Sequence, residues 1–170
     1  MNTLVIANQK GGVGKTTTAV NLSASLFAMK RRVLLVDLDP QANATTGSGI
    51  KKIQETEGLA LPSWEEDKTQ IKTSKTGGYD VLPSGPILIA KEAELRAIEE
   101  RELQLDRLLQ QLENKYDYII IDCPPALNLL TINGLRAANN LLVPMQCEYY
   151  ALEGLAALLQ TVDQLNERTG

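Results

Sequence analysis

A glycine-rich segment near the N-terminus carries the residue types that bind phosphate. It reads Gln9-Lys10-Gly11-Gly12-Val13-Gly14-Lys15-Thr16-Thr17 and lies between a short apolar run and a stretch with helical spacing. The pattern G-x-x-x-x-G-K-[ST] fails at one position, because Gln9 stands where its first glycine belongs. The glycines still let backbone N–H groups turn toward phosphate oxygens at a helix N-terminus. We expect Lys15 to supply charge for the β- and γ-phosphates and Thr16 a hydroxyl ligand for Mg²⁺.

Two acids, Asp37 and Asp39, follow the apolar run at 32–37. Ligands of open α/β sheets collect at the carboxyl ends of strands, so a catalytic role is one interpretation. An ordinary turn at Asp39-Pro40 with an Asx hydrogen bond is the other. The catalytic interpretation is favoured beside a glycine loop, because phosphoryl transfer needs a group that orients the attacking water and the chain contains no histidine.

A third acid, Asp122, ends the apolar run at 116–122 (YDYIIID). An acid after several β-branched residues can hold Mg²⁺, commonly through a bound water. An apolar strand followed by an aspartate is weak evidence alone. Together with Lys15 and Thr16 it is strong, because both motifs must then meet at one metal ion.

Alternating strands and helices are expected to position these groups. Apolar runs predict buried strands, and periodic apolar residues predict helices. The strands are expected at 3–8, 32–37, 79–83, 116–122 and 140–145, and the helices at 16–29, 91–114, 127–138 and 149–167. This order predicts an α/β fold, a mostly parallel β-sheet with helices on both faces, in a single domain over 1–170. Residues 48–78 are polar and are expected to form a surface excursion with one or two short helices.

Bulk composition excludes several classes of function. The chain has 170 residues and a net charge of −4, so no large basic surface binds nucleic acid by charge alone. Cys123 and Cys147 lack metal-ligand spacing and are interpreted as small buried hydrophobic residues in a reducing compartment. There is no secretory signal, and no apolar run approaches the roughly 20 residues needed to cross a bilayer. A cytoplasmic protein is therefore expected.

The motifs resemble those of the ParA/MinD group of ATPases. Lys10-Gly-Gly-Val-Gly-Lys15-Thr16 is similar to that group's deviant Walker A motif, in which a lysine precedes the glycines. LLVDLDPQANATTG, IIIDCPP and PMQCEYYALEGL occur in the same order as in ParA/Soj-type partition ATPases. The likeness covers nearly the whole chain except 48–78.

The resemblance implies a P-loop NTPase that binds ATP and Mg²⁺. It implies catalytic roles for Lys10, Lys15 and Asp39, with Asp39 positioning the attacking water. The nucleotide would be bound by Lys10, Gly11, Gly12, Val13, Gly14, Lys15, Thr16 and Thr17. Thr16 and Asp122, the latter through water, would hold the metal, and Asp37 would lie in the second shell. Residues 42–47 and the Asp-x-Pro-Pro beginning at Asp122 match the family's two switch segments.

The resemblance also implies partners. These are a second copy in an ATP-dependent homodimer, in which Lys10 reaches the other subunit's phosphates, a ParB-type protein that accelerates slow hydrolysis, and nonspecific DNA of a bacterial nucleoid. Relatives continue beyond the point matching Gly170 with adenine contacts and basic DNA-binding residues, so a C-terminally short domain is expected. No membrane contact is expected.

Four functions remain open at this point. The first is an ATP-driven switch for chromosome or plasmid partitioning, or for another cargo. The second is a MinD-like membrane-associated ATPase, which would want a C-terminal amphipathic helix. The third is an iron-protein reductase, which needs two suitably placed cysteines per subunit. The fourth is a nucleotide-binding module that does not hydrolyse ATP.

Overall fold

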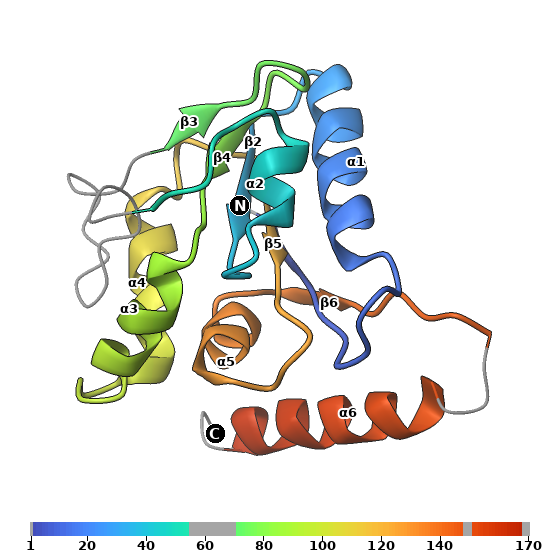
Figure 1. Ribbon diagram of the computed structural model, residues 1–170, viewed down its shortest axis with the longest axis vertical. Coiled ribbons are helices and arrows are strands. Elements are labelled where there is room, and N and C mark those ends of the chain that lie inside the picture. Colours follow the sequence, from blue (N-terminus) through green and yellow to red (C-terminus); the bar gives the residue numbers. More distant parts are fainter. Residues whose placement is uncertain (1, 55–70, 148–150, 168–170) are drawn as a thin grey trace.

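The computed structural model describes residues 2–54, 71–147 and 151–167. Its elements are, in chain order, β1 (Asn2–Ile6), α1 (Lys15–Ala28), β2 (Val33–Asp37), α2 (Asn43–Gly47), β3 (Lys72–Thr73), β4 (Asp80–Leu82), α3 (Ile87–Leu95), the 3-10 turn η2 (Arg101–Leu103), α4 (Gln104–Gln111), β5 (Tyr118–Asp122), α5 (Leu129–Arg136), β6 (Asn140–Leu142) and α6 (Ala151–Glu167). Figure 1 shows their arrangement.

The strands form one sheet in the order β3-β4-β2-β5-β1-β6. All neighbouring pairs are parallel except β3 with β4. The expected α/β fold with a mostly parallel sheet is therefore confirmed. The strand order places β5 between β1 and β2, so Asp122 pairs with Ile6 on one side and Asp37 on the other.

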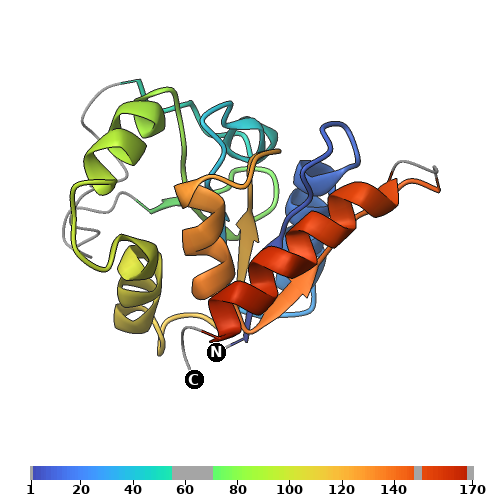
Figure 2. The ribbon, with the colours of Figure 1, turned by 90° about the horizontal axis from the view of Figure 1, so that it is seen from below.

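Successive residues of the strands contribute alternately to two apolar cores, one on each face of the sheet. On one face, Leu35 and Ile120 pack with Ala19 of α1. On the other face, Leu34 and Ile121 pack beneath α3, α4, α5 and α6. Figure 2 shows α1 on one side of the sheet and α3, α4 and α5 on the other. Burial of both faces explains why the central strands read as continuous apolar runs.

The prediction of one continuous helix at 91–114 is wrong. The structure has α3, the η2 turn and α4 in its place. Glu100 has a φ of 52°, and the Gln104 side chain donates to the carbonyls of Glu99 and Glu100. This break turns the chain so that Leu95 and Leu105, on separate helices, are both fully buried in one core.

Two other expectations need correction. Cys123 is buried as expected, but Cys147 is exposed. The last strand is shorter than 140–145 and lies at the sheet edge, where Asn140 is exposed and Leu141 is half-buried, because only β1 pairs with it. The described parts of 48–78 contain the two-residue strand β3 and no helix, and the one or two short helices expected in this range stay a prediction. Residues 55–70, including Trp64, lie outside the described residues.

Candidate functional site

The glycine loop joins β1 to the N-terminal end of α1 (Figure 1). Gly12 has a φ of 74° and Gly14 a φ of 92°, left-handed conformations that strain any residue with a Cβ. A Cβ built on Gly11, Gly12 or Gly14 would meet no described atom within 4 Å. Gly14 caps α1 without a side-chain hydrogen bond to the first turn. The loop is therefore open, and the N-terminal end of the helix dipole faces it, which favours an anion.

Lys15 begins α1 and is buried, with its ammonium folded back onto the loop. Its Nζ donates to the Lys10 carbonyl at 3.0 Å. Burial lowers the pKa of Lys15, and the nearby carboxylates of Asp122 and Asp39 partly oppose that shift. The ammonium thus lies in the same electrostatic environment as two of the acids that the sequence singled out.

Asn8 organises the entrance to the loop and was not identified from the sequence. Its Oδ1 accepts from the backbone N–H of Lys10 at 3.0 Å, and its Nδ2 donates to the Pro144 carbonyl at 2.8 Å. This buried amide therefore ties the lysine that precedes the glycines to the segment after β6. The sequence feature that could have indicated this role is the position of Asn8 at the junction of the expected strand and the glycine loop.

Asp122 and Thr16 meet at the carboxyl end of β5. The Thr16 hydroxyl donates to Asp122 Oδ2 at 2.7 Å. The other oxygen, Oδ1, is buried and has no hydrogen-bond partner among the described residues. Burial is the main cause that raises the pKa of Asp122 to about 7, with the hydrogen bond from Thr16 opposing it. A buried carboxylate oxygen without a donor is costly unless a cation or donor satisfies it.

Asp37 differs from Asp122 because both of its oxygens are satisfied. Oδ1 accepts from the backbone N–H of Asp39 at 3.1 Å, while Oδ2 accepts from the N–H and hydroxyl of Thr45 at 2.8 and 2.7 Å. Burial is the main cause that raises the pKa of Asp37 to about 6. Its predicted place in the second shell of a metal stays a prediction.

Asp39 reaches the cavity beside the loop. Its Oδ1 accepts from the backbone N–H of Gln41 at 2.9 Å, which is the Asx turn weighed as the alternative role. The side chain nevertheless lines a cavity of about 360 Å³. The cavity lining comprises Gly11, Gly12, Gly14, Lys15, Thr16, Thr17, Asp39, Gln41, Asn43 and Pro125. The turn therefore fixes the carboxylate at the edge of the cavity.

The residues present fit a metal-bound phosphate chain. An open loop with left-handed glycines and a buried ammonium suit phosphate oxygens, and the unpartnered Asp122 Oδ1 beside the Thr16 hydroxyl suits a hard cation. Within the described ranges, no group of three or more acidic or cysteine side chains forms a metal cluster. The pair of Thr16 and Asp122 suits Mg²⁺, which usually takes one or two protein ligands together with phosphates and water.

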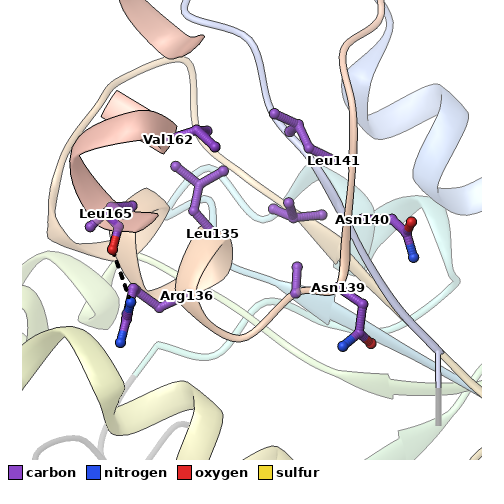
Figure 3. A pocket seen from close by; sticks show the side chains of 9 residues that line it. Leu135, Arg136, Asn139, Asn140, Leu141, Val162 and Leu165 are labelled. Carbon is purple, nitrogen blue, oxygen red and sulfur yellow. Dashed lines mark hydrogen bonds between the residues drawn. The ribbon is translucent and has the colours of Figure 1, made fainter. Parts of the chain in front are cut away.

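A larger cavity of about 480 Å³ lies elsewhere, between β6, α5 and α6 (Figure 3). Leu135, Leu141 and Val162 contribute apolar side chains to it. The Arg136 guanidinium donates to the Leu165 carbonyl at 3.3 Å, at the C-terminal end of α6. None of the predicted site residues lines this cavity, so its size does not make it the candidate site.

The chain was compared with known protein families and curated proteins. The AAA domain family matches residues 1–170. Chromosome partitioning protein ParA of Myxococcus xanthus is 49% identical over 166 residues, which cover 96% of this chain and 59% of that protein. Sporulation initiation inhibitor protein Soj of Bacillus subtilis is 51% identical over 162 residues, 94% of this chain and 64% of Soj. This chain therefore spans about three fifths of the length of these relatives.

Solved structures agree with the fold. Cobyrinic acid a,c-diamide synthase from Mycobacterium smegmatis, with bound ADP and magnesium, has a TM-score of 0.91 at 38% identity, covering 98% of this chain and 69% of that chain. A plasmid partition protein from Borrelia burgdorferi bound to AMPPNP has a TM-score of 0.82 at 31% identity, covering 97% and 71%. With the family match over the whole chain, these likenesses show that the protein belongs to the ParA/MinD-like family of AAA domains, within the P-loop ATPases.

Proposed function

We propose that this chain binds ATP with Mg²⁺ at the glycine loop and hydrolyses it slowly, as a dimerising switch of the ParA type in chromosome or plasmid partitioning. The observation that carries this proposal is the junction of Thr16 with Asp122, where one carboxylate oxygen is bonded and the other has no partner among the described residues. The nucleotides and magnesium held by the similar structures support the choice of ligand.

The proposed roles of the loop residues follow from the positive charge of Lys15 and from the backbone N–H groups at the N-terminal end of α1. Backbone N–H groups from Gly12 to Thr17 bind phosphate oxygens, and Lys15 leaves the Lys10 carbonyl to neutralise the β- and γ-phosphates. Thr16 and Asp122, the latter through a water, would hold Mg²⁺. When bound, Mg²⁺ would supply positive charge against the negative charge that develops on the phosphate oxygens.

Asp39 orients the attacking water in this proposal. Its carboxylate is held at the cavity edge by the Gln41 N–H, and the second carboxylate oxygen can accept a hydrogen bond from water. Positioning of this kind supplies most of the catalysis in phosphoryl transfer, because the protein forms no covalent bond to the phosphorus.

Lys10 acts on the phosphates of a second copy. Its backbone N–H donates to Asn8, and its side chain is half-exposed. A lysine that completes the neighbouring site makes hydrolysis depend on dimerisation, as an arginine finger does in other NTPases. Hydrolysis then limits the lifetime of the dimer. The proposed partners, which come from the family resemblance, are a ParB-type protein that accelerates hydrolysis and nonspecific DNA. The name of the Myxococcus xanthus relative, a chromosome partitioning protein, is consistent with a DNA cargo.

The decisive experiment measures ATP turnover and oligomeric state together. Steady-state phosphate release is measured with and without Mg²⁺, DNA and a ParB-type protein, and mass is measured by light scattering with ATP or ADP. The proposal expects slow Mg²⁺-dependent turnover, a dimer with ATP and a monomer with ADP. Tight ATP binding without any turnover would instead identify a nucleotide-binding module. An absorption spectrum with iron–sulfur bands would identify the redox alternative.

Membrane association is tested separately. No helix within the described ranges is both long and apolar enough to cross a bilayer. A MinD-like function would require ATP-dependent co-sedimentation with vesicles of anionic phospholipid. The proposal expects the protein to stay in the supernatant with either nucleotide.

A further inference from the structure

A buried hydrogen-bond chain connects Asp39 to two hydroxyl residues that do not line the cavity. One of them lies in the 42–47 segment, but neither carries a predicted role. The residues are Thr45 in α2 and Ser84, two positions after the end of β4, and both are at most 1% exposed. Their segments come together because β4 pairs with β2 in the sheet. Two parts of the chain 39 residues apart are thereby joined beneath one turn.

The chain of bonds passes through Asp37. Its carboxylate accepts from the Asp39 N–H through Oδ1, and from both the N–H and hydroxyl of Thr45 through Oδ2. The first turn of α2 has no side-chain cap of its own. Asp37 therefore satisfies an N–H of that turn and fixes α2 to the backbone on the N-terminal side of Asp39.

Ser84 completes the chain on the other side of Asp39. The Thr45 hydroxyl, which donates to Asp37, also accepts from the Ser84 N–H at 2.9 Å. The Ser84 hydroxyl donates to the Asp39 carbonyl at 2.7 Å. The N–H and the carbonyl of Asp39 are thus both held by one closed set of bonds.

Ser84 is itself rigidly held. Its carbonyl accepts from the Ile53 N–H at 3.0 Å. A Cβ added at the following Gly85 would lie 1.8 Å from the Ile53 carbonyl oxygen, so the two backbones are in close contact. Ser84 can therefore act as a fixed point for the turn, because its own backbone has little room to move.

We propose that Thr45 and Ser84 are positioning residues for Asp39, an inference that rests on the proposed hydrolysis. They do not line the cavity and act only through the backbone of Asp39. The Thr45 hydroxyl is the central group because it donates to one partner and accepts from another. Without it, the Ser84 N–H loses its acceptor and the Asp39 turn loses the connection between its two ends. A 1 Å displacement of a positioned group can cost about 100-fold in rate.

The test replaces single hydroxyl groups at nearly constant volume. Thr45→Val removes the hydroxyl, Thr45→Ser restores it without the methyl group, and Ser84→Ala removes the second hydroxyl. Ser48→Ala is the matched control, since Ser48 also buries a hydroxyl beside α2 but bonds to Ala44 and Tyr79. For each variant, kcat, the Kd for an ATP analogue and the midpoint of thermal unfolding are measured.

The proposal expects Thr45→Val and Ser84→Ala to lower kcat about 10- to 100-fold, with the Kd changed by less than about threefold. Thr45→Ser should retain most of the wild-type kcat. In an Asp39→Asn background neither change should lower the residual turnover further, because there is no carboxylate left to position. A loss of kcat in Ser48→Ala equal to that in Thr45→Val, or an equal further loss in the Asp39→Asn background, would overturn the proposal.

Hydrogen exchange tests the same connection without chemistry. In the nucleotide-free protein, Thr45→Val should increase amide exchange in a peptide covering 38–42 by about tenfold, while a peptide from β1 exchanges as in the wild type. Unchanged exchange at 38–42 would overturn the proposal even if turnover fell. If the wild type hydrolysed no ATP, the proposed function would fail, and this measurement would still decide whether Thr45 holds the turn.

Discussion

The Thr16 hydroxyl donates a 2.7 Å hydrogen bond to Asp122, although 106 positions separate the two residues in the chain. Thr16 lies in the first turn of α1, and Asp122 ends β5, the strand that pairs with both β1 and β2. The same carboxylate keeps one buried oxygen without a partner among the described residues. Among the described residues, the protein therefore places a buried carboxyl oxygen without a partner near the open glycine loop.

Stability of the ligand-free protein should fall as pH rises toward neutrality. The pKa of Asp122 is raised from 3.8 to about 7, mainly by burial, so the folded protein holds a proton that the unfolded chain releases. The contribution of this group is fully present below pH 3.8 and is lost as pH rises through about 7. Denaturant titrations at pH 5 and 8 should show this loss, and it should shrink in Asp122→Asn.

Stabilisation by magnesium should increase with pH, whereas the stability of the ligand-free protein should decrease. Mg²⁺ needs the ionised carboxylate, so the increase in unfolding midpoint on adding Mg²⁺ with ADP should grow from pH 5 to 8. Asp122→Asn should lose most of that increase at pH 8. An equal Mg²⁺ effect at both pH values in the wild type would contradict the assignment of Asp122 to the metal.

Much of this fold could be predicted from the sequence because strands buried on both faces are continuous apolar runs. Residues 32–37 and 116–122 illustrate this pattern, and each run ends in an acid. The rule that parallel strands present their carboxyl ends together places both acids at one edge of the sheet. Their pairing as neighbours depends on the strand order, which the sequence does not show. The break in 91–114 could not be predicted, because Leu95, Ile98 and Leu105 keep apolar spacing across it.

The support beneath Asp39 could not be predicted for a different reason. Thr45 lies in the 42–47 segment that resembles a family switch, but nothing in that segment distinguishes its hydroxyl group, and Ser84 belongs to no motif. Their contact depends on β4 lying next to β2, which is a property of the strand order. Likewise, the buried Asn133 joins α5 to the Leu105 N–H and the Arg101 carbonyl, contacts that exist only once the helices have packed.

Gly14→Ala should weaken both the fold and the loop, and Gly11→Ala provides a matched control. Gly14 has a φ of 92°, whereas Gly11 is not among the residues with a positive φ, and a Cβ at either meets no described atom within 4 Å. Gly14→Ala should lower the free energy of unfolding by about 1–2 kcal/mol through backbone strain alone. Gly11→Ala should change it by less than about 0.5 kcal/mol. Equal losses in denaturant titrations would mean that strain at Gly14 is not the cause.

Asp39→Asn should separate binding from hydrolysis. The amide oxygen can still accept from the Gln41 N–H, so the turn keeps its shape. The attacking water would lose the carboxylate proposed to orient it, which should lower kcat by about 100-fold or more. The Kd for ATP with Mg²⁺, measured by fluorescence, should change by less than about threefold. A parallel loss of binding and turnover would place Asp39 among the nucleotide ligands.

Lys10→Ala should abolish turnover, and mixing it with a second inactive variant should restore part of the turnover. If Lys10 completes the partner's site, a heterodimer of Lys10→Ala with Asp39→Ala contains one site that has both an intact Asp39 and a facing Lys10. An equimolar mixture of these two inactive proteins should therefore regain about a quarter of wild-type turnover, since half the dimers are mixed and one of their two sites is complete. If Lys10 served its own subunit, no site in the mixture would be intact and the activity would stay absent. Turnover that survives in Lys10→Ala alone would remove the lysine from the mechanism.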